Sequence, residues 1–113
     1  MGRVRTVQKK EISLPRLDRL HPTLESTVLK LLEEAGELAQ AVGKFRGLNG
    51  ESVSMSPNEV LQLITRELLD VAQTTVSMMF VLEEEYDIDL TAAIEQHIQK
   101  LVAKGYLEKN GAN

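Results

Sequence analysis

Apolar residues recur at helical spacing along three stretches of the chain, and residues that begin or end helices bound each stretch. In the first stretch, from Leu24 to about Phe45, apolar side chains follow one another at intervals of three and four residues, as along one face of an α-helix. Thr23 is a suitable N-cap before it, and Gly43 and Gly47 are suited to end it. The pattern therefore predicts a long amphipathic helix.

The second stretch has the clearest start signal in the chain. Ser56 stands at the N-cap, Pro57 at the first helical position, and Glu59 completes a capping box. The apolar pattern then continues to about Glu85, which predicts a helix of roughly 40 Å at ~1.5 Å per residue. Such a helix is long for one small domain, and it is apolar around much of its girth.

Two shorter elements complete the pattern. Asp89 is suited to cap a last helix, which ends at Gly105. Before the first long helix, the leucines within residues 14–20 recur at helical spacing and predict a short helix or turn that ends near residues 21–22.

These elements predict one all-α domain, because no stretch alternates apolar and polar residues as a strand does. We expect a helical bundle of two long helices and one or two shorter ones. The long second helix needs partners to cover it, so we expect oligomerisation, as a homodimer or homotetramer, to complete the bundle. The expected boundaries are a flexible arm at 1–12, the domain at 13–107 with a small-residue loop at 47–56, and a polar tail at 108–113.

Composition narrows the classes of function. The chain has no cysteine, which excludes disulfides and thiolate metal sites and fits a cytoplasmic protein. A net charge of −4 without a long basic stripe argues against nucleic-acid binding, and no apolar run approaches the ~20 residues of a membrane span. Aromatic residues make up only 4% of the chain. Stacking on a nucleotide base must therefore be weak, with low selectivity for the base, or must use one of the four aromatic residues. These are Phe45, Phe80, Tyr86 and Tyr106.

Two acidic groups lie inside the predicted long helices. They read Glu33-Glu34-Ala35-Gly36-Glu37 and Glu67-Leu68-Leu69-Asp70. On a wheel of ~100° per residue, the apolar arc of the first helix centres near Ala35 and Val42. Glu34 flanks this arc, Glu37 lies further round on the same side, and Glu33 points away.

On the second helix, Glu67 falls inside the apolar arc, between the rows of Val60, Ile64 and Val71, and Asp70 flanks it. Charged residues are almost never fully buried unless they are paired. Glu67 is therefore the acidic residue with the fewest explanations other than a site.

If the long helices pack antiparallel through these arcs, four carboxylates converge: Glu34 and Glu37 from one helix, Glu67 and Asp70 from the other. Four oxygen ligands without His or Cys suit a hard ion, with Mg²⁺ first, Mn²⁺ second and Ca²⁺ less suited. Without metal the cluster would repel itself, so metal binding and folding should be coupled. The alternative is that the glutamates of the first helix are solvated surface charges.

The pattern E-E-x-x-E followed by E-x-x-D, on two helices of an all-α domain, resembles the MazG-like nucleoside triphosphate pyrophosphohydrolases of the all-α NTP pyrophosphatase superfamily. The resemblance covers roughly residues 24 to 104. It implies Mg²⁺-dependent hydrolysis of a (d)NTP between the α and β phosphates to (d)NMP and pyrophosphate, with nucleotide-pool house-cleaning as a role. It also places the Mg²⁺ ligands at Glu34, Glu37, Glu67 and Asp70, and gives Glu33 a supporting catalytic role.

The same family has a pattern like N-x-x-K-x-x-x-R on the last helix, where this chain has His97, Lys100 and Lys104. The resemblance implies that Lys100 and Lys104 contact substrate phosphates as point charges. Alternatively these lysines complement the dipole of a solvated helix end. His97 lies on the apolar stripe, which favours a packed core histidine.

A second class of function stays open. The chain is then a non-catalytic helical adaptor or nucleotide-binding regulatory subunit, whose carboxylates pair with Arg or Lys across an interface. A carboxylate-bridged redox protein is disfavoured, because neither His21 nor His97 forms the Glu-x-x-His motif of such bundles.

Overall fold

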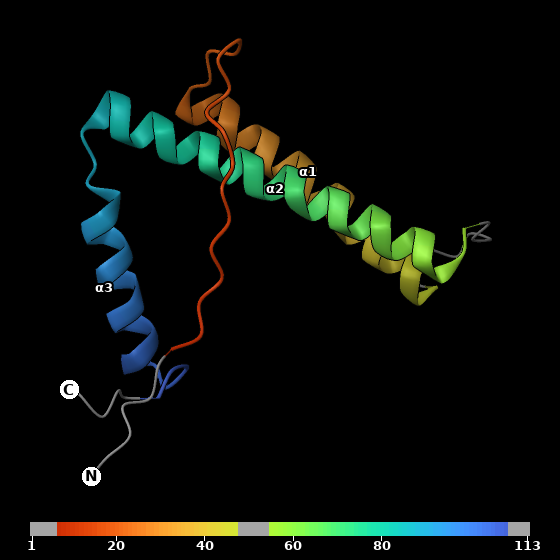
Figure 1. Ribbon diagram of the computed structural model, residues 1–113. Coiled ribbons are helices and arrows are strands. Elements are labelled where there is room, and N and C mark those ends of the chain that lie inside the picture. The colour runs from red at the N-terminus through yellow and green to blue at the C-terminus, as the bar shows by residue number, and fades with distance from the viewer. Residues whose placement is uncertain (1–6, 48–54, 109–113) are drawn as a thin grey trace.

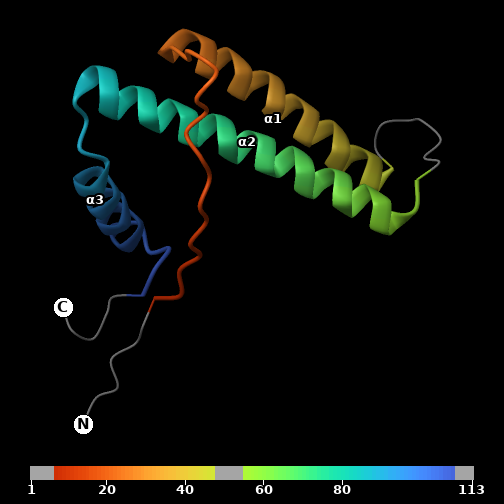
Figure 2. The same cartoon turned by 45° about the horizontal axis from the view of Figure 1, so that its top comes forward.

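The computed structural model describes residues 7–47 and 55–108, which form three helices. They are α1 (Leu24–Arg46), α2 (Pro57–Tyr86) and α3 (Leu90–Ala103). The long helices α1 and α2 lie side by side and antiparallel, and α3 leaves the far end of α2 and points away from both (Figure 1, Figure 2). The described residues contain no strand, so the predicted all-α class is confirmed. Most of the predicted loop, and parts of the predicted arm and tail, lie outside the described residues.

Reciprocal hydrogen bonds begin both long helices. The Ser26 N–H donates to Thr23 Oγ1 at 3.0 Å, and the Thr23 N–H donates to Ser26 Oγ at 2.8 Å. The predicted box of Ser56 and Glu59 forms in the same way, with distances of 2.9 and 3.2 Å. Each box satisfies backbone N–H groups that a first helical turn leaves unpaired, so the starts of α1 and α2 are fixed locally.

The helix ends follow the sequence less closely. Gly47 ends α1 in the left-handed conformation, with φ of 69°, which glycine adopts without steric cost. The prediction that Gly43 also ends the helix is wrong, because Gly43 is buried within α1. Asp87, with φ of 53°, ends α2, and Asp89 caps α3 as predicted by accepting a hydrogen bond from the Ala92 N–H at 3.1 Å.

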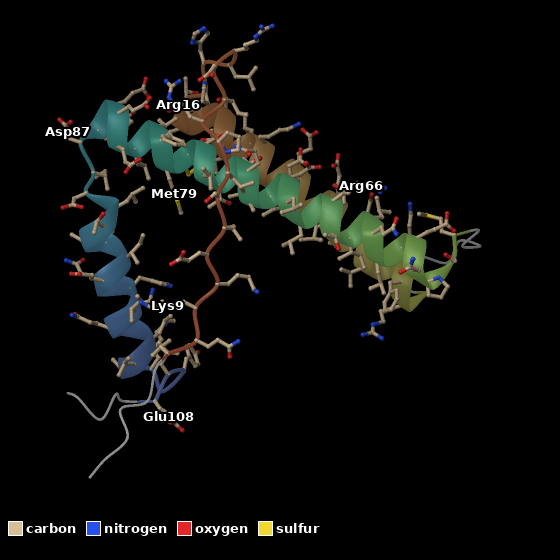
Figure 3. All side chains as sticks on the ribbon, viewed as in Figure 1. Lys9, Arg16, Arg66, Met79, Asp87 and Glu108 are labelled. Carbon is tan, nitrogen blue, oxygen red and sulfur yellow. The ribbon has the colours of Figure 1, made fainter. Side chains whose placement is uncertain are left out.

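The segment before α1 is irregular, with a turn at residues 18–19, so the predicted turn forms and the short helix does not. It crosses α2, and Figure 3 shows Arg16 beside the end of that helix. The Arg16 guanidinium donates to both carboxylate oxygens of Glu84, at 2.8 and 3.0 Å. Gln73 Nε2 donates to the Pro15 carbonyl at 2.8 Å. This hydrogen bond ties the segment to α2.

Few apolar side chains are fully buried between α1 and α2. Among the described residues, the buried apolar side chains are Ala41, Val60 and Val81. The buried polar ones are Thr27, Glu34, Thr74 and Ser77. The radius of gyration is 18.4 Å, against about 13 Å for a compact domain of this length. The single chain is therefore extended, with a thin core.

The buried face of the first helix differs from the centre of the apolar arc predicted for it. The face of α1 that packs on α2 contains Thr27, Glu34 and Ala41, whereas Ala35 and Val42 are exposed. The arc is wider than one neighbouring helix covers, and α2 covers only the edge that contains Glu34. The rest of the arc remains on the surface of the single chain.

Large apolar side chains are consequently exposed on both long helices, Leu32 to 67% and Leu68 to 52%. The others on these helices are Val28, Leu29, Val42, Leu61, Leu69, Met79 and Tyr86. His97, expected in a packed core, is also exposed on α3. Within the described parts of the chain, no helix combines the length and the apolar character needed to cross a membrane.

The ion pair between Arg16 and Glu84 should hold the segment before α1 against α2. The hydrogen bond and charge of Arg16 lower the pKa of Glu84, so the carboxylate is ionised at neutral pH and the pair is formed. In Glu84→Gln we expect trypsin to cleave after Arg19 about two- to fivefold faster, the range of exposed ion pairs. Glu83→Gln, an exposed neighbour, is the matched control, and equal rates for both variants would contradict the assignment.

Candidate metal centre

Glu34 of α1 and Glu67 of α2 face each other across the helix interface, and Asp70 lies one turn beyond Glu67. One carboxylate oxygen from each of the three lies within 4.8 Å of the other two. Glu34 is only 6% exposed, Glu67 is half-buried, and Asp70 is exposed. The cluster thus extends from the interior of the interface to the surface beside Asp70.

The positions of the two glutamates follow from the seven-residue spacing of the buried face. Glu34 lies seven residues from both Thr27 and Ala41, and Glu67 lies seven residues from Val60. Those neighbours are all buried. Seven residues are about two helical turns, so each glutamate stands on the row that faces the other helix.

Two oxygens of the cluster lack a partner. Glu34 Oε2 and Glu67 Oε2 are both buried, and neither has a hydrogen-bond partner. A buried carboxylate oxygen without a partner is costly. Two carboxylates whose oxygens lie within 4.8 Å of each other also repel, by about 3 kcal/mol or more at an effective dielectric of 20. The arrangement therefore calls for a positive charge between the two glutamates.

Lys30 supplies part of this charge from the edge of the cluster. Its Nζ lies 3.1 Å from Glu34 Oε1 and 3.6 Å from Glu33 Oε1. The hydrogen bond to Glu34, followed by the charge of Glu33, raises the pKa of Lys30. Lys30 does not satisfy the second oxygen of Glu34 or of Glu67.

Glu37 and Glu33, the other two predicted site residues, are exposed. The charge of Glu34, then burial and the charge of Glu67, raise the pKa of Glu37, so its carboxylate lies in the field of the cluster. It is nevertheless not among the three groups whose oxygens converge. Glu33 points outward toward Lys30, as the helical wheel predicted.

The donor set fits a hard divalent ion. The converging atoms are all carboxylate oxygens, which Mg²⁺ and Mn²⁺ prefer. Mg²⁺ binds oxygen at about 2.1 Å, so ligands on opposite sides of the ion stand about 4.2 Å apart. The separations in the cluster, up to 4.8 Å, are close to this value, and the two orphaned oxygens are the groups such an ion would satisfy.

The predicted phosphate-binding residues Lys100 and Lys104 lie on or at the end of a helix that points away from the cluster. Lys100 lies on α3 and Lys104 caps its end. From Asp87, α3 runs away from α1 and α2 toward Glu108 (Figure 3). Within one chain, these lysines are therefore not brought to the carboxylate cluster.

Sequence reasoning missed a cavity of about 400 Å³ beside the cluster. Glu34 and Asp70 stand at its wall, together with side chains of the segment before α1 and the buried hydroxyl residues of both long helices. The only sequence signal was the presence of Thr27, Thr74 and Ser77 at buried helical positions, where large apolar residues are usual. Such a signal becomes readable only once the partner helix is known.

Comparisons with known proteins agree with the two-part acidic motif. The model of the MazG nucleotide pyrophosphohydrolase domain matches residues 22–104, close to the range that the motif resemblance covered. No curated protein and no solved structure gives a significant match. The matched region contains all of α1, α2 and α3 and nearly three quarters of the chain. The chain therefore belongs to the MazG nucleotide pyrophosphohydrolase domain family.

Proposed function

We propose that this protein is a Mg²⁺-dependent nucleoside triphosphate pyrophosphohydrolase, which cleaves a (d)NTP between the α and β phosphates to (d)NMP and pyrophosphate. The observation that supports it best is the pair of buried, unpartnered oxygens of Glu34 and Glu67, in a domain of the MazG family. We further propose that it acts in the cytoplasm in nucleotide-pool house-cleaning.

Glu34, Glu67 and Asp70 would hold the metal ion, with Glu37 as a fourth ligand or as the holder of a metal-bound water. When bound, Mg²⁺ polarises the phosphate, neutralises developing charge and lowers the pKa of the attacking water. Lys30 binds Glu34 Oε1 and so leaves the unpartnered Oε2 for the metal ion. One of the carboxylates accepts the proton of the attacking water as general base.

The exposed faces of the long helices support an oligomer, a homodimer or homotetramer, in this proposal. The part of the apolar arc that α2 leaves exposed needs a cover, and a second copy offers the same surface in return. Because α3 points away from the cluster of its own chain (Figure 2), Lys100 and Lys104 would contact phosphates in the site of a neighbouring copy.

The non-catalytic adaptor is less well supported. It requires the carboxylates to be paired with basic side chains, and in the described part of the chain Lys30 alone approaches the buried Glu34. The second oxygens of Glu34 and Glu67 remain without a partner.

Glu67→Gln should abolish hydrolysis, because the amide keeps the volume of the side chain and removes its charge. A metal ligand contributes several kcal/mol to the transition state, so we expect a loss of at least ~100-fold. The assay follows monophosphate and pyrophosphate from a panel of NTPs and dNTPs with Mg²⁺. Glu83→Gln on the same helix should keep full activity. Release of orthophosphate instead of pyrophosphate, or an active Glu67→Gln variant of unchanged helix content, would overturn the proposal.

Metal binding should be visible in thermal unfolding without any substrate. At a hundredfold excess over Kd, an ion that binds only the folded state adds about 2.7 kcal/mol and raises Tm by about 10 °C. In Glu34→Gln, we expect the metal-free Tm to rise, since one buried charge is gone, and the shift with Mg²⁺ or Mn²⁺ to disappear. A wild-type Tm indifferent to both ions would favour the adaptor.

Subunit mixing tests the shared site. Lys100→Ala and Glu67→Gln should each be impaired alone. In mixed oligomers, one site combines the intact carboxylates of one chain with the intact lysine of the other. For random dimers, about a quarter of wild-type activity should return. No recovery, in mixtures shown to exchange subunits, would place both groups in the same chain's site.

A further inference from the structure

The cavity beside the carboxylate cluster leads from the carboxylates along α1 and α2. Its wall includes Glu34 and Asp70 at the cluster, then Thr74 and Ser77 further along α2. Its volume of about 400 Å³ falls in the range of small-molecule sites. A ligand anchored at the carboxylates would therefore extend into a preformed space.

The residues of α2 along this wall are spaced along the helix axis at distances that match the parts of a nucleotide. Thr74 follows Asp70 by four residues and Ser77 follows it by seven, about 6 Å and about 10 Å along the helix axis. In a nucleotide, the sugar and then the base follow the phosphates at comparable intervals. With the triphosphate at the carboxylates, the sugar would lie beside Thr74 and the base beside Ser77.

Ser77 is the one residue of this wall, among those described, whose side-chain hydroxyl is buried without a partner. The residue is 7% exposed, and its Oγ has no hydrogen-bond partner. By contrast, Thr74 Oγ1 donates to the Asp70 carbonyl at 3.0 Å, and Thr27 Oγ1 donates to the Thr23 carbonyl at 2.8 Å. A buried hydroxyl without a partner is costly unless a ligand satisfies it.

The outer wall of the cavity is mostly apolar. It is formed by the segment before α1, through Leu17, Leu20 and Pro22, with the imidazole of His21 among them. None of the four aromatic residues expected to stack on a base lines this cavity. A base here is therefore held mainly by apolar contact and selected by few hydrogen bonds. Each polar group in the wall then has a large effect on which base is preferred.

The outer wall is fastened to α2 through two consecutive residues that come just before it, Pro15 and Arg16. The bond from Gln73 to the Pro15 carbonyl holds the segment over the middle of α2, and the pair of Arg16 and Glu84 holds it nearer the end of that helix. Figure 1 shows the segment crossing α2 before it enters α1. The wall is thus built by residues that the carboxylate motif does not include.

We propose that this cavity is the nucleoside pocket of the protein, and that the Ser77 hydroxyl reads the edge of the base. The proposal rests on the proposed function for the anchoring of the triphosphate. It adds a specificity residue on α2 and assigns the segment at residues 17–22 as the wall that closes over the nucleoside.

The direct test measures Kd for the non-hydrolysable α,β-imido analogues of the four common dNTPs, with Mg²⁺, by calorimetry. Ser77→Ala should weaken the best-bound analogue by about five- to tenfold, the effect of one hydrogen bond, and narrow the spread between bases. Thr65→Ala, which removes an exposed hydroxyl from the same helix, should change neither. The Tm of Ser77→Ala should be unchanged or higher, because the lost hydroxyl had no partner.

The outcomes separate this proposal from the proposed function. Base-dependent analogue binding that responds to Ser77→Ala, without hydrolysis of any dNTP, would sustain the pocket and overturn the pyrophosphohydrolase. Hydrolysis to pyrophosphate, with the same order of bases and the same Kd values in Ser77→Ala, would overturn the pocket assignment alone.

A footprint provides a second readout that needs no turnover. The bound analogue should slow tryptic cleavage after Arg19, between the wall residues Leu17 and Leu20, by at least about threefold, since the wall then packs on the ligand. Inorganic triphosphate, which lacks a nucleoside, should leave the rate unchanged. Equal protection by both would show that the cavity holds phosphate and would contradict the proposal.

Discussion

The burial of two carboxylates against each other is the constraint on which this structure depends. Glu34 and Glu67 take the positions on the α1–α2 interface where apolar side chains would normally pack, and each keeps a buried oxygen without a partner. Lys30 pairs with one oxygen of Glu34, and the remaining repulsion and the unpartnered oxygens call for a cation between the two glutamates. The interface between the long helices therefore serves mainly as a binding site and only to a small extent as a hydrophobic core. This explains why so few apolar residues are buried there.

The thin core has a consequence for assembly. A chain that buries Thr27, Glu34, Thr74 and Ser77 between its longest helices must gain stability elsewhere, and its remaining apolar surface lies on the opposite edge of the same helices. In the proposed oligomer, a second copy covers this surface and also supplies Lys100 from α3. The packing that stabilises the fold and the charge that completes the site would then come from the same contact.

The sequence predicted what local chemistry determines. Capping at Ser56 and Asp89, the course of the long helices, and the placing of Glu34 and Glu67 on facing rows all follow from spacing within one helix. Prediction from the sequence failed where a neighbouring element determines the structure. The exposure of Ala35 depends on which edge of α1 is covered by α2. The irregular segment before Thr23 is held to α2 by a hydrogen bond from Gln73, 58 residues from its acceptor. The cavity needs both elements at once, so no pattern along the chain could show it.

The limits of the family match sharpen this distinction. The match begins at residue 22, whereas Leu17 and Leu20 of the cavity wall, and the Arg16 that fastens it, come before that point. The carboxylates that would carry the chemistry lie inside the matched region. Most of the outer wall of the cavity, including Leu17 and Leu20, lies outside the match, and Pro22 is the first residue of the match. The proposed base-reading residue Ser77 lies inside the match, whereas most of the wall that would hold the base comes before it. Membership of the family therefore indicates the chemistry more directly than it indicates which base is selected.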